Sequence, residues 1–538
     1  MKKFVLLVAF FVAQLGFGQE DALVFFADKE NVAASLDDPI IILTQDAIDR
    51  KLMHNTPIDE RDVPLNENYK TLVNDSPGID VFAKSKWMNA VYVRGSQLDI
   101  ENLLGLPFVV EVEFMDKSLN FWGGNDQHDD KFAMENEQAR IIYDYGAALN
   151  QTEMLAVDKL HEADFNGEGM VVAVLDSGFP DVMTNPAFAD VVSEGRLLGT
   201  YDFAERQTNV DGTGSHGIRT SSDIGGFLDG EFVGTAPAAS FYLFRTEYGP
   251  TENPVEEAWW VEALERADSL GVDVINTSLG YQDYDNPNYD HSYEDLDGQT
   301  TIGARGANNA FDKGMILVTS AGNDGQGFVF VATPGDSPGM LTIGAVDSNG
   351  DYASFSSIGP TVDGRIKPDV MAQGQDAANI DQNGNVDFNN GTSFSSPITA
   401  GAVASLWQAR PEVVNYRVMD VIRESAHLYN NPTDEMGYGI PNFEDALMAL
   451  QNLGTEDEFR NSQFVIYPNP ASNEVNISFP VDEAIATATL YDIFGKKISE
   501  TEISTSKQTV NLRGLASGMY LLKIHSKNST NSFKVLKK

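Results

Sequence analysis

The stretch MVVAVLDSG, residues 170–178, joins a run of apolar residues to a polar turn. Residues 170–175 are apolar without polar alternation, and a strand of this kind belongs to a sheet that is covered on both faces. Asp176 ends the strand, and Ser177-Gly178 begins the turn. In open α/β sheets, functional sites form beyond the carboxyl ends of the strands, so we place Asp176 at such a site.

Four more apolar runs follow this first one, and helix-like segments separate them. These further candidate strands are residues 241–244, 272–276, 315–319 and 341–346. Between the first two runs, Pro254 opens an amphipathic segment that Gly271 ends, as expected of a helix. This alternation predicts a doubly wound α/β domain with a mostly parallel sheet over residues 151–455.

The region before this domain has a different pattern. Apolar runs at residues 40–43, 90–93 and 109–114, with a helix-like stretch at 97–104, predict a small α+β unit. We assign this unit to residues 20–118. Residues 119–150 turn polar, with Gly, Asn and Asp, and predict a linker that leads into the main domain.

The region after the main domain consists of short apolar runs separated by turns. They lie at residues 464–467, 475–479, 486–493, 509–512 and 519–524. This pattern predicts a small all-β sandwich over residues 460–538.

The amino terminus has the form of a secretory signal. Lys2 and Lys3 precede the apolar run 4–13, and small residues follow it. The run is too short to span a bilayer, and no other stretch is long and apolar enough to do so. We therefore expect residues 1–19 to be a signal peptide on an exported protein without a transmembrane segment.

The charge is strongly negative and unevenly distributed. The 538 residues contain 80 Asp and Glu against 36 Lys and Arg, which gives a net charge of -44, and there is no cysteine. Residues 119–459 carry -40 of this charge, whereas residues 460–538 carry +4. Such a surface repels phosphate backbones, which excludes nucleic-acid partners, and the lack of cysteine excludes disulfides and thiolate chemistry.

Three polar residues at the ends of predicted elements could act together as a nucleophile, a general base and a group that orients the base. Ser393 stands where a helix begins, His216 lies in a Gly-rich segment, and Asp176 ends a strand. A hydroxyl is a weak nucleophile at neutral pH and needs a base, which in turn needs a group that fixes its tautomer. The oxyanion of acyl transfer also needs donors, and the Asn323 amide and the Ser393 N–H are candidates.

The motifs around these residues resemble those of the subtilase family of serine proteases, in which the chain order is also Asp, His, Ser. The motifs are LDSG at 175–178, GSHG at 214–217, NTSLG at 276–280, SAGN at 320–323, KPDV at 367–370 and GTSFSSP at 391–397. The resemblance implies a subtilisin-like fold and hydrolysis of peptide bonds through an acyl-enzyme. It also implies that Asp176, His216 and Ser393 are catalytic and that Asn323 forms the oxyanion hole. The residues that it implies for substrate binding are Ser278, Leu279, Gly280 and Gly322.

Some positions depart from the family pattern. Thr213 stands where many members have a second histidine, and Gly217 replaces a branched aliphatic residue. After the serine, Phe394, Ser395 and Ile398 replace a frequent Met, Ala and His. None of these changes removes a proton-transfer group, so they bear on substrate preference.

The flanking regions also resemble known parts of subtilase precursors. Residues 20–118 resemble the inhibitory, chaperone-like propeptide, and residues 467–538 resemble the C-terminal sorting domain of the type IX secretion system of Gram-negative bacteria. We therefore expect a monomeric zymogen that is exported through the periplasm to the cell surface or medium. Its expected partners are protein or peptide substrates and the type IX machinery.

Several competing interpretations remain. GDSPG at 335–339 fits the nucleophile elbow of an esterase, but Pro338 lacks the N–H that such an elbow uses, so a turn is favoured. Residues 381–387 resemble a calcium loop, and an Asn-Gly hairpin is favoured instead.

The chemistry needs no cofactor. The acidic loop 283–297 is either a structural calcium site or a solvated loop. The alternative function is an inert surface or adhesive protein on a subtilase fold.

Overall fold

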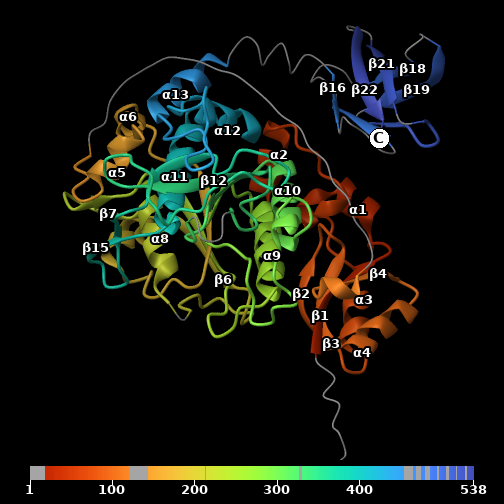
Figure 1. Ribbon diagram of the computed structural model, residues 1–538, viewed down its shortest axis with the longest axis horizontal. Coiled ribbons are helices and arrows are strands. Elements are labelled where there is room, and N and C mark those ends of the chain that lie inside the picture. The colour runs from red at the N-terminus through yellow and green to blue at the C-terminus, as the bar shows by residue number, and fades with distance from the viewer. Residues whose placement is uncertain are drawn as a thin grey trace, which may run out of the picture. The chain divides into compact units, whose positions relative to one another are not determined.

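The computed structural model describes residues 19–120, 143–212, 214–325, 330–453, 464–467, 474–478, 485–492, 496–504, 508–516, 518–526 and 530–537. The chain forms two compact units, Met1–Leu450 and Gln451–Lys538 (Figure 1). The predicted signal peptide up to residue 18, residues 121–142 of the predicted linker and Thr213 lie outside the described residues.

Seven parallel strands form the central sheet of the first unit, in the order β13-β12-β11-β10-β5-β9-β6. They are β5 (Val171–Asp176), β6 (Leu197–Asp202), β9 (Ser240–Arg245), β10 (Val274–Thr277), β11 (Ile316–Ser320), β12 (Met340–Val346) and β13 (Val370–Gln373). All five strands predicted for this domain from continuous apolar runs are present, as β5, β9, β10, β11 and β12. The two edge strands were not predicted, because β6 is half-exposed and contains Gly199 and β13 has only four residues.

Helices cover both faces of this sheet, which confirms the doubly wound α/β architecture (Figure 1). One face carries α8 (His216–Gly225) and α11 (Thr392–Gln408), and the other carries α9 (Val255–Leu270) and α10 (Ile302–Asp312). As predicted, α9 begins after Pro254 and ends at Gly271, which adopts φ 86°. A positive φ at the helix end favours glycine, because its missing Cβ removes the clash.

Shorter elements complete the first unit after the linker. The helices are α5 (Leu149–Met154), α6 (Val157–Glu162), η5 (Pro186–Phe188), α7 (Ala189–Ser193), η6 (Tyr293–Asp295), α12 (Asn415–Glu424) and α13 (Phe443–Asn452). Two antiparallel hairpins pair β7 (Phe227–Leu228) with β8 (Phe232–Val233) and β14 (Ala377–Ile380) with β15 (Val386–Asn389). No helix within the described residues is long and apolar enough to cross a membrane.

The N-terminal part of the first unit is an antiparallel sheet in the order β2-β3-β1-β4. Its elements are β1 (Gln19–Phe26), α1 (Val32–Asp37), η1 (Pro39–Ile41), α2 (Gln45–Met53), η2 (Glu60–Asp62), α3 (Glu67–Asn74), β2 (Asp80–Ser85), β3 (Ala90–Ser96), α4 (Gln97–Asn102), η3 (Leu103–Gly105), β4 (Val109–Phe114) and η4 (Lys117–Leu119). The predicted α+β unit is therefore present. The strand predicted at 40–43 is wrong: Pro39 starts a 3₁₀ turn there, and the side chains of Ile40 and Ile41 are 49% and 61% exposed.

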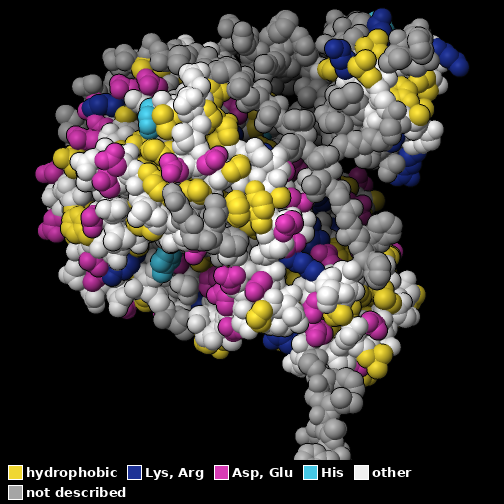
Figure 2. Space-filling model, viewed as in Figure 1, with side chains coloured by type: hydrophobic (Ala, Val, Ile, Leu, Met, Phe, Trp, Pro, Cys, Tyr) yellow, Lys and Arg dark blue, Asp and Glu magenta, His cyan; other side chains and the backbone are white. Residues whose placement is uncertain are grey.

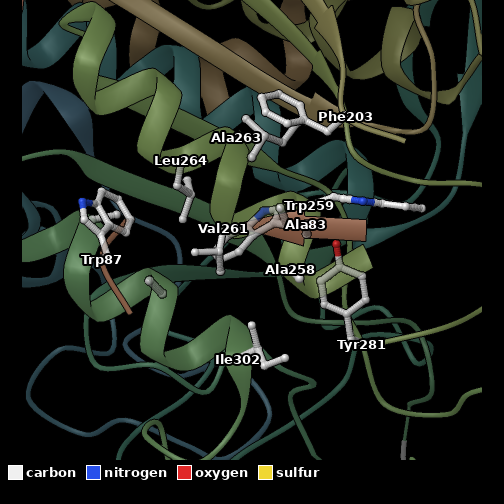
Figure 3. Packing of buried hydrophobic residues seen from close by; sticks show 14 of the residues in the cluster. Ala83, Trp87, Phe203, Ala258, Trp259, Val261, Ala263, Leu264, Tyr281 and Ile302 are labelled. Carbon is white, nitrogen blue, oxygen red and sulfur yellow. The ribbon is translucent and has the colours of Figure 1, made fainter. Parts of the chain in front are cut away.

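This antiparallel sheet packs directly on α9. Ala83 and Trp87 join Trp259, Val261 and the rest of α9 in one apolar cluster (Figure 3). Fully burying a large apolar side chain stabilises by about 1.5–3 kcal/mol, so this shared cluster is a strong attachment. It also explains why α9 is buried around most of its circumference, charged residues included.

The second unit contains two small antiparallel sheets, with the orders β16-β17-β20 and β19-β18-β21-β22. The strands are β16 (Val465–Tyr467), β17 (Glu474–Ser478), β18 (Ile485–Asp492), β19 (Lys497–Ser504), β20 (Thr509–Asn511), β21 (Gly518–Ser526) and β22 (Thr530–Lys537). An apolar cluster from both sheets forms its core, as in the predicted sandwich. The polar edge strands β19 and β22 were not predicted. Lys and Arg side chains are prominent on this unit, whereas Asp and Glu are scattered over the first (Figure 2).

Candidate active site

Asp176 is completely buried at the carboxyl end of β5. Its carboxylate accepts hydrogen bonds from Ser177 N at 2.7 Å, from Thr220 Oγ1 at 3.1 Å and from His216 Nδ1 at 2.8 Å. Burying a carboxylate is costly unless hydrogen bonds replace its water shell, and these donors do so. The carboxylate is thus fixed in position at the edge of the sheet.

His216 is the first residue of α8, and its ring faces Asp176. Its Nδ1 lies 2.8 Å from Oδ1 and 3.0 Å from Oδ2 of the carboxylate. This contact leaves Nε2 as the nitrogen available to a substrate or a nucleophile. Burial by itself would lower the pKa of His216, but the charge and hydrogen bonds of Asp176 outweigh it and raise that pKa above its ordinary value.

Gly217 allows α8 to approach β5 this closely. A Cβ at this position would lie 2.4 Å from Gly178 O and 3.0 Å from Asp176 Cβ. The branched residue common in the family would therefore require the helix to move. A glycine at position 217 is therefore compatible with the His216–Asp176 contact, because it has no Cβ to clash.

Ser393 is the second residue of α11, and it is 8% exposed. Its backbone carbonyl accepts a hydrogen bond from Ser278 Oγ at 2.8 Å, and its own Oγ donates to Ser278 O at 3.4 Å. The neighbouring Phe394 ring lies 6.1 Å from the His216 ring, measured between centroids. Ser393 and His216 thus share one end of the sheet, although no hydrogen bond joins them within the described part of the chain. Such bonds are often long before substrate binds.

Asn323 lies on the exposed segment that follows β11. Its Oδ1 accepts hydrogen bonds from the backbone N–H of Thr392 at 2.9 Å and from Thr392 Oγ1 at 3.0 Å. Because Oδ1 is held by Thr392, the Nδ2 group remains as a donor beside Ser393. Gly391, with φ 151°, has no Cβ, and a Cβ built there would be in van der Waals contact with Nδ2 at 3.7 Å. The glycine therefore leaves this side of the amide uncovered by its own side chain.

The predicted substrate-binding residues lie on the two segments that meet Ser393. Ser278 contacts it directly, Leu279 is half-buried, and Gly280 is exposed. Gly322 donates its N–H to Thr392 Oγ1 at 3.2 Å and has φ 107°, which favours glycine. All the site residues predicted from the sequence are therefore gathered at the carboxyl edge of β5, β10 and β11 and the start of α11.

The two competing motifs form turns. Ser337 is completely buried, donates to Asn308 Oδ1 at 2.7 Å and accepts from Gly339 N at 3.1 Å, so it is not presented to a substrate. Asp381 closes the hairpin between β14 and β15 and accepts from the N–H groups of Asn383 and Asn385 at 2.8 and 2.9 Å. Both observations agree with the favoured interpretations.

Three acidic residues near the site were not predicted: Glu247, Glu252 and Glu256. One carboxylate oxygen from each lies within 4.8 Å of the others, a grouping that could hold a cation. Burial raises the pKa of Glu247 to about 8 and that of Glu256 to about 9. Glu247 comes two residues after the end of β9, so the rule that selected Asp176 would also have selected it.

The acidic loop 283–297 uses several of its carboxylates in protein contacts. Asp290 accepts the N–H of Tyr284 at 2.8 Å, and Asp295 pairs with Lys117 at 2.7 Å. Asp297 accepts the N–H groups of Gln299 and Thr300 at 2.8 Å. A calcium ion on this loop remains a prediction.

Comparison with protein families assigns all three parts of the chain. Residues 167–439 match the model of the subtilase family, residues 21–133 match a peptidase S8 propeptide domain of Bacteroidota, and residues 465–538 match a secretion system C-terminal sorting domain. The resemblances to a propeptide and to a type IX sorting domain are confirmed. The sorting domain marks the protein for secretion.

Known proteins with similar sequences include several proteases. The serine protease AprX of Bacillus subtilis (strain 168) is 28% identical over 314 residues, which cover 52% of this chain and 66% of AprX. Subtilisin E of the same organism is 28% identical over 58% of this chain and 74% of its own length. Human membrane-bound transcription factor site-1 protease is 28% identical over 62% of this chain and 29% of its own length.

Among solved structures, MycP1 with the N-terminal propeptide removed is 23% identical and has a TM-score of 0.44, covering 56% of this chain and 96% of that chain. MycP1 from Mycobacterium smegmatis gives a TM-score of 0.43 at 23% identity, covering 59% of this chain and 89% of that chain. The subtilase model alone matches half of the chain, over the part that holds Asp176, His216, Asn323 and Ser393. The chain therefore belongs to the subtilase family.

Proposed function

We propose that this protein is a secreted serine endopeptidase with Ser393 as nucleophile, His216 as general base and Asp176 as the group that orients His216. The observation that carries the proposal is the 2.8 Å contact between His216 Nδ1 and buried Asp176, at the sheet edge where α11 presents Ser393. Asp176 fixes the tautomer in which Nε2 can accept the Ser393 proton. No cofactor is needed for these steps.

The reaction follows from these positions. Ser393 Oγ attacks the scissile carbonyl while His216 takes its proton, and the carbonyl oxygen becomes an oxyanion. Asn323 Nδ2 and the Ser393 N–H stabilise that charge, and Asn323 is held for this by its Oδ1 contacts with Thr392. His216 then returns the proton to the leaving amine, which gives an acyl-enzyme. Water, activated by His216, hydrolyses the ester in the same way.

The substrate lies between two segments of the chain in this proposal. Ser278, Leu279 and Gly280 run along one side, and Gly322 lies on the other beside Asn323. Exposed backbone at Gly280 can pair with an extended peptide, the usual form in which a strand-like ligand binds. Proteins and peptides are therefore the proposed substrates. The sorting domain would bring the enzyme to the type IX machinery.

The test is hydrolysis of casein by the purified, processed protein and two serine variants. Ser393→Ala should abolish hydrolysis, whereas Ser337→Ala should retain it, because Ser337 is a buried turn residue. Activity that survives in Ser393→Ala would refute the proposal. Activity lost only in Ser337→Ala would point to the esterase elbow, and an inactive wild type would point to the inert adhesive protein.

A further inference from the structure

Arg245 is a buried cation at the carboxyl edge of the central sheet, on the strand next to that of Asp176. It is the last residue of β9 and is 1% exposed. Strand β9 lies between β5 and β6, and the register places Arg245 beside Asp176 on one side and beside Asp202 on the other. A buried charge is strongly unfavourable unless other groups compensate it, so the partners of this guanidinium indicate what it does.

The guanidinium joins an acidic partner to the turn that follows Asp176. Its Nη1 donates to Asp202 Oδ2 at 2.6 Å, and its Nε donates to the backbone carbonyl of Ser177 at 3.1 Å. Asp202 is itself fixed, because it is 1% exposed and its Oδ1 accepts the N–H groups of Ala204 and Glu205 at 2.9 Å. The Ser177 carbonyl is therefore held by a side chain that cannot turn away without breaking a buried ion pair.

The turn at Ser177 contacts Asp176 directly and also contacts the chain that leads to His216. Ser177 N donates to Asp176 Oδ1 at 2.7 Å, and the same oxygen lies 2.8 Å from His216 Nδ1. Gly212, shortly before His216 in the chain, packs against the other side of the turn. A Cβ built on Gly212 would lie 2.4 Å from the Ser177 carbonyl oxygen and 3.2 Å from Arg245 Nε. A shift of this carbonyl would therefore be felt on both sides of the His216–Asp176 contact.

The surroundings of Arg245 indicate that it matters more for the position of the turn than for folding. Its Nη2 is buried and makes no hydrogen bond within the described part of the chain. Apolar side chains of similar volume often replace a buried ion pair at little or no cost in stability. Stability alone is therefore a weak reason for a guanidinium at this place.

We propose that Arg245 is a positioning residue, which holds the turn at Ser177 so that Asp176 and His216 keep their mutual geometry. It acts through the Ser177 carbonyl and the pair with Asp202, and it does not touch the reacting atoms. The inference rests on the proposed catalytic function and adds one more side chain to the set that orients His216. Because Asp176 raises the pKa of His216, loosening the turn should bring that pKa back toward its ordinary value.

The first test compares steady-state kinetics of the processed wild type and two variants on one peptide substrate. Arg245→Met combined with Asp202→Asn removes the guanidinium without leaving a buried charge unpaired, so this double variant should fold. We expect kcat to fall at least about 10-fold with little change in KM, because small displacements of catalytic groups slow the reaction. The midpoint of kcat/KM against pH should move downward. Arg245→Lys keeps the charge but lacks the fork that reaches both partners, so it should recover stability and leave kcat reduced.

The matched control removes another largely buried guanidinium, at the opposite edge of the sheet. Arg423 pairs with Asp369 at 2.8 Å just before β13, and Asp369 keeps a second partner in Lys367 at 2.7 Å. Arg423→Met should therefore lower the melting temperature while kcat and the pH midpoint stay unchanged.

The second test needs no catalysis. In the full chain carrying Ser393→Ala, the proton NMR signal of His216 Nδ1–H reports the contact with Asp176, and its titration gives the pKa of His216. The double variant should shift this signal upfield and lower that pKa. Activity that survives in Ser393→Ala would overturn the proposed function, whereas this measurement would still test Arg245.

Three results would overturn the positioning role. The first is a folded double variant with wild-type kcat, pH midpoint and proton signal. The second is a loss confined to KM, and the third is an equal loss of kcat in Arg423→Met. Should the double variant fail to fold, Arg245→Lys decides by the same measurements, and wild-type values in that variant would contradict the proposal.

Discussion

His216 Nδ1 lies 2.8 Å from Oδ1 of Asp176, and that carboxylate is completely buried. The contact fixes which ring nitrogen carries the proton before any substrate arrives. Asp176→Asn preserves the shape but offers an N–H where His216 needs an acceptor, so the ring is held in the wrong tautomer. We expect kcat to fall by about 10⁴-fold with a small change in KM. Steady-state kinetics on a peptide substrate check this, with the exposed Asp190→Asn as control.

The pH dependence of activity should follow the ionisation of His216. Asp176 raises the pKa of His216 above its ordinary value, and the ring acts as a base only when neutral. Activity should therefore rise with pH through a midpoint above about 6.5, the usual pKa of histidine. A profile of kcat/KM against pH measures that midpoint. A midpoint at or below the ordinary value would contradict the electrostatic role of Asp176.

Asn323 provides a donor that acts only when charge develops on the substrate oxygen. Asn323→Asp keeps an oxygen for the Thr392 contacts but removes the Nδ2 donor. We expect kcat to fall by about 10²- to 10³-fold and KM to change little. A rise in KM of similar size, with kcat unchanged, would show instead that Asn323 binds the substrate in its ground state. Asn349→Ala, on an exposed turn, is the control.

The sequence could predict the site because the fold places strand ends together. Asp176 and Asn323 follow apolar strands, and Ser393 opens a helix, so their meeting follows from parallel order. The role of Gly217 could not be predicted, because it depends on the distance from α8 to the backbone at Gly178.

The parts that could not be predicted are mainly those whose environment comes from distant residues. The edge strands β6, β19 and β22 mix polar with apolar residues, and β13 has only four residues, so none of them stands out as a long apolar run. Ile40 and Ile41 look strand-like in the sequence, but they are exposed in the 3₁₀ turn η1. Asp268, in α9, and Lys313, just after α10, look like surface residues in the sequence, but both are buried in ion pairs with propeptide residues between 50 and 62.

Calcium binding at the cluster of Glu247, Glu252 and Glu256, a different place from the loop 283–297 considered in the sequence, can be tested through stability. If the cluster of Glu247, Glu252 and Glu256 holds the ion, binding must displace protons from Glu247 and Glu256, whose pKa values burial raises to about 8 and about 9. The increase in melting temperature caused by calcium should then grow as the pH rises from 7 to 9. Glu247→Gln should weaken it. A melting temperature that is the same in calcium and in chelator would exclude a stabilising ion.

Stability in acid should depend on Asp268. Burial alone would raise the pKa of this carboxyl, but Lys51 and Arg50 outweigh it and lower that pKa to about 2 from an ordinary 3.8. A lowered pKa contributes stability above the unfolded value and loses it as the pH falls toward the folded value. The contribution is about 2 kcal/mol at neutral pH and disappears between about pH 4 and pH 2.

Urea unfolding of the Ser393→Ala chain at several pH values measures this effect. Asp268→Asn should show a smaller loss of unfolding free energy over that interval. Identical losses in both proteins would contradict the assignment.

The most direct test of the account is covalent labelling of the processed protein with a fluorophosphonate, followed by mass spectrometry of its peptides. The account predicts one adduct per chain, on Ser393, and no adduct after His216→Ala or Ser393→Ala. A label on Ser337 or another serine, or no label on the folded wild-type protein, would contradict the proposed catalytic site.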